Sequence, residues 1–86
     1  MEKYNVIFTK SSVKELDGIG RKDAQRILKR ASKLAANPRP MDCEKLSARP
    51  LYRIRQGDYR IIYFINDSNR IVDIIKIGHR REIYRL

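Results

Sequence analysis

The fold is decided by residues 51–65, LYRIRQGDYRIIYFI, where two runs of aliphatic and aromatic residues flank the pair Gly57-Asp58. Such runs are typical of β-strands, and a short break that begins with glycine is typical of a tight hairpin turn. We therefore expect two antiparallel strands, Leu51–Gln56 and Tyr59–Ile65, joined by a two-residue turn.

The register of this hairpin follows from the turn. It places Ile54 opposite Ile61 and Arg55 opposite Arg60, whereas a slip of one residue would set Ile54 against Arg60 and spoil the apolar face. The apolar face, which we expect to point towards the helices, consists of Tyr52, Ile54, Ile61, Tyr63 and Ile65. The opposite face carries Arg53, Arg55 and Arg60.

The segment before the hairpin reads as one strand and two helices. Residues Tyr4–Phe8 suit a short strand, and Ser12 followed by Glu15 forms a capping box for a short helix that ends at Gly18. Apolar residues at spacings of three and four predict a longer helix over Arg21–Ala36. The outward face of that helix is expected to carry Lys22, Arg26, Lys29, Arg30 and Lys33.

The remaining segments complete an α+β fold. Residues 37–50 are expected to be a linker that contains one fragment with a helical pattern, Asp42–Leu46, and a last strand is expected over Arg70–Ile77. The order is therefore strand-helix-helix-strand-strand-strand. Because consecutive strands joined by short turns pair antiparallel, we expect both helices on one face of a mainly antiparallel sheet. A chain of 86 residues has room for a single domain, 1–86.

Composition limits the classes of function. Cys43 is the single cysteine and His79 the single histidine, which excludes an internal disulfide and the usual Cys/His metal sites. There is no run of about 18 apolar residues and no apolar leader, so we expect a cytoplasmic protein without a membrane partner. The net charge of +10 indicates a polyanionic partner, which on charge alone could be nucleic acid, an anionic membrane or an acidic protein.

The arginines distinguish the second half of the chain from the first. Residues 1–43 hold six Lys and four Arg, whereas residues 44–86 hold two Lys and eight Arg. Arginine presents a planar fork that matches phosphate, and a pair of opposed arginines costs some tenths of a kcal/mol in a sheet unless an anion lies across it. These arginines either bind a phosphate or merely solvate one face of the sheet. The C-terminal segment Gly78–Tyr84 is likewise either functional or an ordinary basic terminus.

Several of these stretches carry a family likeness. Lys45-Leu46, residues 52–55 (YRIR), residues 57–63 (GDYRIIY) and residues 77–84 (IGHRREIY) resemble the pattern of the RelE/ParE toxin superfamily, and the likeness spans nearly the whole chain. The resemblance implies the toxin of a type II toxin–antitoxin system. It further implies an endoribonuclease that cleaves messenger RNA in the A site of the 30S subunit by 2′-OH attack, without metal or other cofactor. Its partners would be the ribosome, the messenger and a cognate antitoxin.

The resemblance also implies the residues of the site. It assigns catalytic roles to Arg53, Arg55, Arg60, Arg80 and Tyr84. To these we add His79, the group that titrates near neutral pH, and we expect RNA contacts from Lys45, Arg49, Tyr59 and Arg81. The chain departs from the family pattern at three positions. It carries Arg53, Arg55 and His79 where a well-known member of the family has lysines. Because arginine is essentially never deprotonated, we expect His79 or Tyr84 to handle the proton while the arginines stabilise charge on the phosphate.

Two other functions fit the same residues. A ParE-like toxin would have the same fold and would inhibit DNA gyrase without cleaving RNA. A non-catalytic RNA- or ribosome-binding domain would need only the positive charge. The His, Arg and Tyr residues of segment Gly78–Tyr84 favour the ribonuclease.

Overall fold

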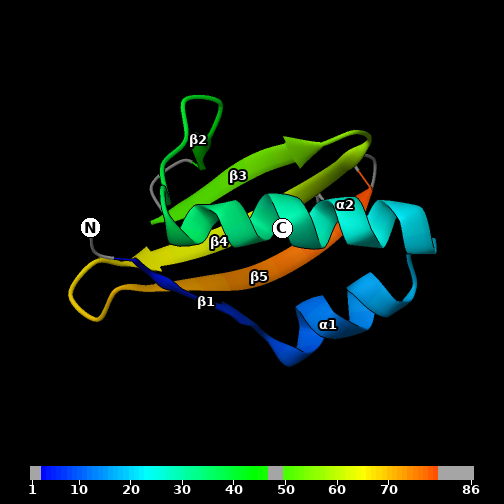
Figure 1. Ribbon diagram of the computed structural model, residues 1–86, viewed down its shortest axis with the longest axis horizontal. Helices are drawn as coiled ribbons and strands as arrows, with labels where there is room; N and C mark the ends of the chain where they lie inside the picture. The colour runs from blue at the N-terminus through cyan, green and yellow to red at the C-terminus, as the bar shows by residue number, and fades with distance from the viewer. Residues whose placement is uncertain (1–2, 47–49, 80–86) are drawn as a thin grey trace.

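A five-stranded sheet organises the computed structural model, which describes residues 3–46 and 50–79 (Figure 1). The strands are β1 Asn5–Phe8, β2 Glu44–Leu46, β3 Leu51–Gln56, β4 Tyr59–Asn66 and β5 Ile71–His79. They lie in the order β1-β5-β4-β3-β2, and all neighbours are antiparallel except β1 and β5, which are parallel. The predicted α+β fold with a mainly antiparallel sheet is confirmed.

The central hairpin has the predicted register. Gln56 pairs with Tyr59 across the turn, and Ile54 pairs with Ile61. Gly57 has a φ of 60°, a left-handed conformation that glycine adopts without the steric cost of a Cβ atom. The alternation of the two strands therefore sends one set of side chains to the helices and the other set to the opposite face.

Two helices cover the apolar face of the sheet. They are α1 Lys10–Asp17 and α2 Arg21–Ser32, which continues as the short 3-10 helix η1 Lys33–Ala35. Figure 1 shows α2 lying across the sheet and α1 beside β5. The core between these layers consists of Ile27, Ala31, Leu34, Ile54, Ile61, Tyr63, Ile65, Val72, Ile74 and Ile77. The predicted helix Arg21–Ala36 is thus correct except that its last turn is 3-10.

The start of α1 differs from the prediction. Thr9, rather than Ser12, is the N-cap, and its Oγ1 accepts a hydrogen bond from Ser12 N at 3.2 Å. Glu15 does not complete a capping box, because its Oε1 accepts from the backbone N–H of Ile77 at 3.1 Å. This bond satisfies a donor of β5 beyond the point where β1 stops pairing with it, and so protects an otherwise open sheet edge.

Two further boundaries were wrong. The fragment Asp42–Leu46 contains strand β2 instead of a helix, since a five-residue helix is unstable alone and the free edge of β3 offers backbone partners. Strand β5 runs two residues past the predicted Ile77, so that Gly78 and His79 belong to the sheet. Within the described residues, no helix is both long and apolar enough to cross a membrane.

Candidate functional site

Three arginine side chains gather on the face of the sheet that points away from the helices. The register of β3 and β4 places Arg55 directly opposite Arg60, and Arg53 lies on the same face two residues earlier. Arg60 is only 6% exposed, and the side chains of Arg53 and Arg55 are 13% and 58% exposed. We call this surface, made of Arg53, Arg55 and Arg60, the arginine face.

Glu44, at the start of β2, pairs with two of these arginines, and the third acts on it through its charge. Glu44 Oε2 accepts a hydrogen bond from Arg53 Nη2 at 2.7 Å, and Glu44 Oε1 lies 3.5 Å from Arg55 Nη2. The hydrogen bond from Arg53, together with the positive charges of Arg53, Arg55 and Arg60, holds the pKa of Glu44 below its ordinary value. Three guanidinium groups from two strands therefore act on one carboxylate.

Local hydrogen bonds fix the position of Arg60. Its Nη1 donates to the carbonyl oxygens of Tyr59, at 3.2 Å, and Gly57, at 3.4 Å, which tie the guanidinium to the hairpin turn. Its Nε is buried and has no hydrogen-bond acceptor among the described residues. A buried donor without an acceptor is uncommon in folded proteins, so the described residues leave part of the Arg60 fork unsatisfied.

Three other predicted site residues lie on the opposite face. The cross-strand partner of Tyr59 is His79, and their rings meet edge to face with centroids 5.8 Å apart. Both line a hollow of about 360 Å³ beside the C-terminal end of α1. Lys45 pairs with Tyr52 and is exposed on that same side of the sheet. The fold thus separates Tyr59, His79 and Lys45 from the arginine face.

The other predicted site residues are Arg49, Arg80, Arg81 and Tyr84, and they lie outside the described residues. Sequence reasoning missed Glu44, because the segment around it was expected to be helical rather than a strand beside Arg53. The signal that could have found Glu44 was its charge, since opposite charges are favoured at directly opposed positions of neighbouring strands. Within residues 3–46 and 50–79, no cluster of three His, Cys, Asp or Glu side chains is placed to hold a metal ion.

The chemistry of the arginine face is that of an anion site. Arginine makes charge-assisted hydrogen bonds to planar carboxylates and to phosphate oxygens through the same fork. The Glu44 carboxylate therefore occupies a position that an external phosphodiester could take. Fixed guanidinium groups at such a position would also stabilise negative charge that grows on phosphorus.

Comparison with known proteins identifies the family. A family model described as "ParE toxin of type II toxin-antitoxin system, parDE" matches residues 6–84. Toxin RelE of Mycobacterium tuberculosis (strain ATCC 25618 / H37Rv) is 44% identical over 36 residues, which cover 42% of this chain and 37% of that toxin. The similarity to this toxin thus spans less than half of its length.

Solved structures share the fold over almost the whole chain. A chain of the archaeal RelE–RelB complex from Pyrococcus horikoshii OT3 is 33% identical with a TM-score of 0.81, and the match covers 92% of this chain and 97% of that one. A chain of the toxin–antitoxin complex RelBE2 from M. tuberculosis is 25% identical with a TM-score of 0.81, covering 91% and 99%. The chain belongs to the ParE toxin family of type II toxin–antitoxin systems, within the RelE/ParE superfamily that its hairpin motif resembles.

Proposed function

We propose that this protein is a toxin that cleaves messenger RNA in the A site of the ribosome, and that the arginine face is its catalytic surface. The observation that carries the proposal is the grouping of Arg53, Arg55 and Arg60 on one face of the sheet, where Arg53 and Arg55 pair with Glu44 and Arg60 acts on it through its charge. A phosphodiester that displaced this carboxylate would meet guanidinium groups already in place. The family match supports the toxin role. A toxin that acts on the ribosome would work in the cytoplasm.

In the proposed reaction the ribose 2′-OH attacks the adjacent phosphorus, and the 5′-oxygen of the next nucleotide leaves with a proton. Arg60 holds the scissile phosphate, because its guanidinium is buried and tied to the turn. Arg53 and Arg55 stabilise the charge that accumulates on the equatorial oxygens, with Arg80 added from the tail. No metal ion is assigned a role in this mechanism.

Proton transfer needs a group other than arginine. Of the two candidates, His79 lies with Tyr59 on the far side of the sheet, which argues against its direct contact with a phosphate on the arginine face. We therefore assign a proton-transfer role to Tyr84, which lies two residues short of the position of the tail tyrosine in the superfamily pattern. Under this assignment, His79 takes no direct part in the reaction.

A cognate antitoxin is the proposed protein partner. The similar structure from M. tuberculosis is a toxin–antitoxin complex and that from P. horikoshii is a RelE–RelB complex, and the match covers at least 97% of the compared chain in each. We expect a partner encoded beside this chain to bind it and to block messenger cleavage. Failure of the neighbouring gene product to bind would count against the toxin assignment.

The experiment is messenger cleavage in a translating extract, with Arg60→Ala compared with Arg21→Ala, which removes an exposed arginine at the start of α2. Loss of one preorganised donor should slow cleavage by about two to three decades. Arg21→Ala should cut at the wild-type rate. Arg60→Lys, which keeps the charge but loses the fork, should fall between the two, and thermal unfolding of each variant shows that it is folded.

Undiminished cleavage by folded Arg60→Ala would exclude the arginine face as the catalytic surface. In the same extract, Tyr84→Phe tests the proton assignment, since general acid–base catalysis contributes about two to four decades. A wild-type rate for Tyr84→Phe would return the proton step to His79.

A second candidate function follows from the family model, which is described for ParE toxins. A ParE-like toxin would inhibit DNA gyrase and leave messengers intact. Expression in cells separates the two: the ribonuclease produces cut messengers, whereas a gyrase inhibitor induces the DNA-damage response. DNA damage without cut messengers would replace the proposed function by this one.

A further inference from the structure

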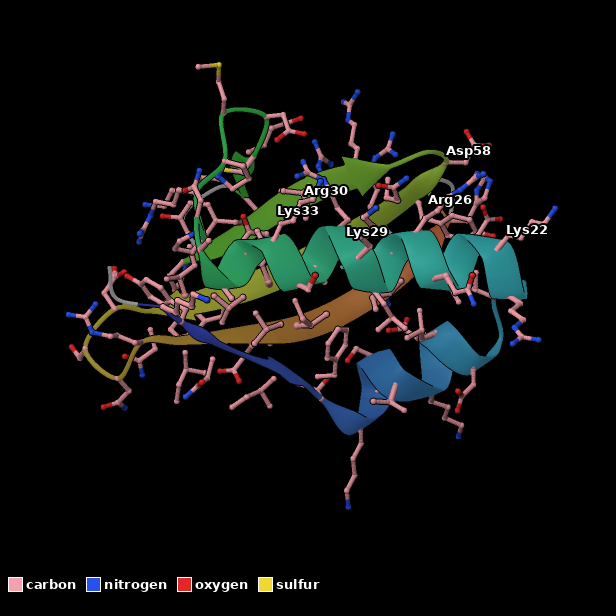
Figure 2. All side chains as sticks on the ribbon, viewed as in Figure 1. Lys22, Arg26, Lys29, Arg30, Lys33 and Asp58 are labelled. Atoms are coloured by element: carbon pink, nitrogen blue, oxygen red, sulfur yellow. The ribbon has the colours of Figure 1, made fainter. Side chains whose placement is uncertain are left out.

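A row of cations follows the outer side of α2. Lys22, Arg26 and Lys29 of α2, and Lys33 where η1 continues the helix, are all exposed. Figure 2 shows them spread along the helix together with Arg30. With about 100° of rotation per residue, the four positions fall within about 60° of arc and extend over about 16 Å of the axis. We call these four residues the α2 basic row.

Arg30 stands apart from the row because it is already engaged. Its Nη2 donates to the carboxylate of Asp42, and its side chain is only 19% exposed. By contrast, no ion pair joins Lys22, Arg26, Lys29 or Lys33 to an acidic side chain in the part of the chain that the structure describes. Among the described residues, the four exposed charges of the row therefore have no ion-pair partner.

Folding does not favour this arrangement. Like charges at i, i+3 and i, i+4 destabilise a helix by about 0.2–0.5 kcal/mol per pair, and the row contains three such pairs. Lys22 also lies in the first turn, where the helix dipole disfavours a positive charge. A polyanion lying along the helix would turn these unfavourable terms into binding energy.

The neighbouring side chains distinguish RNA from an acidic protein. A hollow of about 310 Å³ beside the row is lined by Gln25 and three of its cations, with no apolar residue among them. Protein interfaces are usually centred on buried apolar or aromatic side chains, and the exposed Leu28 lies well outside the arc of the row. A nucleic-acid duplex instead presents phosphates in series, on the order of one charge per 2 Å of its axis.

The row lies on the opposite side of the molecule from the arginine face. Helix α2 packs through Ile27, Ala31 and Leu34 onto the apolar face of the sheet, so its outer side points away from Arg55 and Arg60. The packed helix and the sheet therefore lie between the two basic surfaces. An RNA strand at the arginine face and an RNA at the row must be separate segments.

We propose that the α2 basic row binds the phosphate backbone of a structured RNA, and so forms a second RNA surface that grips without cutting. The inference rests on the proposed function in one respect, since it takes the structured RNA to be that of the ribosome. The row would hold the ribosomal RNA while the arginine face engages the messenger. This gives a physical reason for the dependence of cleavage on the ribosome.

The test uses a matched pair of triple variants of the whole chain. Lys22→Gln/Lys29→Gln/Lys33→Gln removes three lysines from the row. Lys3→Gln/Lys10→Gln/Lys14→Gln removes three exposed lysines from segments outside α2, so the two proteins have the same composition and net charge. The probe is a stable RNA hairpin, whose affinity is measured between about 50 and 200 mM salt.

We expect the row variant to bind the hairpin at least about tenfold more weakly than the control variant, with a salt slope smaller by about three. Equal affinities of the two variants would overturn the inference. It would also be overturned if the row variant lost binding to the neighbouring gene product but kept the hairpin, since the row would then be a protein contact.

Messenger cleavage, measured for the same proteins, separates this inference from the proposed function. If the wild type cuts no messenger but the row variant alone loses the hairpin, the RNA surface stands and the proposed function fails. If the wild type cuts messengers and both variants bind the hairpin alike, the proposed function stands and the row carries no RNA.

Discussion

The arginine face and the α2 basic row are both positively charged, yet they differ in the burial, hydrogen bonding and acidic neighbours of their side chains. Arg60 on the face is buried and tied to backbone carbonyls, and its charge helps to lower the pKa of Glu44. Lys29 and Lys33 on the row are exposed on a helix surface, without a described acidic neighbour. One surface holds its charges at fixed points, and the other presents them on long, mobile side chains.

The difference indicates how a small basic domain can separate catalysis from binding. Fixed guanidinium groups cost little reorganisation when charge develops on a phosphate, which is the condition for transition-state stabilisation. Mobile lysines adapt to many backbone geometries and bind through counterion release, which is strong but not specific. The arginine face therefore suits a single phosphate, and the row suits a series of them.

The largest expected effect tests whether the arginine face acts as one unit. Arg55→Ala and Arg60→Ala should each slow messenger cleavage by about two to three decades. The double variant should lose less than the product of the two, because both groups act on the same phosphate and such losses are not additive. Single-turnover cleavage rates in a translating extract measure all three variants.

The row provides the contrast for this comparison of single and double variants. Lys29→Gln and Lys33→Gln should weaken hairpin binding by factors that multiply, because neighbouring lysines contact different phosphates. If losses at Arg55 and Arg60 multiplied in the same way, the distinction between a fixed site and a mobile row would fail.

A smaller effect is expected at Glu44, whose carboxylate competes with RNA for the arginine face. Glu44→Gln should bind a short single-stranded RNA more tightly and with a salt slope steeper by about one, because Arg53 and Arg55 lose a competing anion. The pH dependence has a definite sign. Because Arg53 lowers the pKa of Glu44 from 4.5, wild-type affinity should rise as the pH falls through that lowered pKa and the carboxylate is protonated.

The variant should lack this rise, since glutamine does not titrate. Binding of an uncleavable RNA with a 2′-deoxy sugar measures affinity apart from cleavage. Weaker binding by Glu44→Gln would mean that Glu44 orients the arginines more than it blocks them.

Sequence predicted the parts of the molecule where local signals agree. The β3–β4 hairpin was predicted with its register, because a glycine turn and two apolar faces leave one pairing that buries both Ile54 and Ile61. Strand β2 was missed, because three residues carry no periodicity and this strand exists only through its pairing with β3. Glu44 was missed for the same reason.

The position of His79 shows a second limit. Its place in the chain, next to Arg80, suggested a shared site with the arginines. Pairing of β5 with β4 extends to His79 and sends its side chain to the face of Tyr59. Because side chains alternate between the two faces along a strand, the pairing register of β5 decides which face His79 joins. Sequence alone does not fix where a strand ends, and the end of β5 decided this point.

The smallest expected effect concerns Arg39, an arginine whose role is structural, and thereby sharpens the contrast with Arg60. Arg39 Nη1 and Nη2 donate to the two carboxylate oxygens of Asp67 at 3.2 and 2.9 Å, and Tyr4 also donates to Asp67. These hydrogen bonds, of which that from Arg39 has the larger effect, lower the pKa of Asp67 from 3.8 to about 2.

A carboxylate with a depressed pKa stabilises the fold above its unfolded pKa, and this contribution is lost as the pH falls through the folded value. Between pH 3.8 and about 2, the melting temperature of the wild type should therefore fall more steeply than that of Asp67→Asn, with Asp17→Asn as the control that also loses one exposed carboxylate. Messenger cleavage at neutral pH should not change in Asp67→Asn, because neither Arg39 nor Asp67 belongs to the arginine face. Parallel melting curves for Asp67→Asn and the wild type would show that this ion pair, although bidentate, adds nothing measurable to the fold, as is common for exposed pairs.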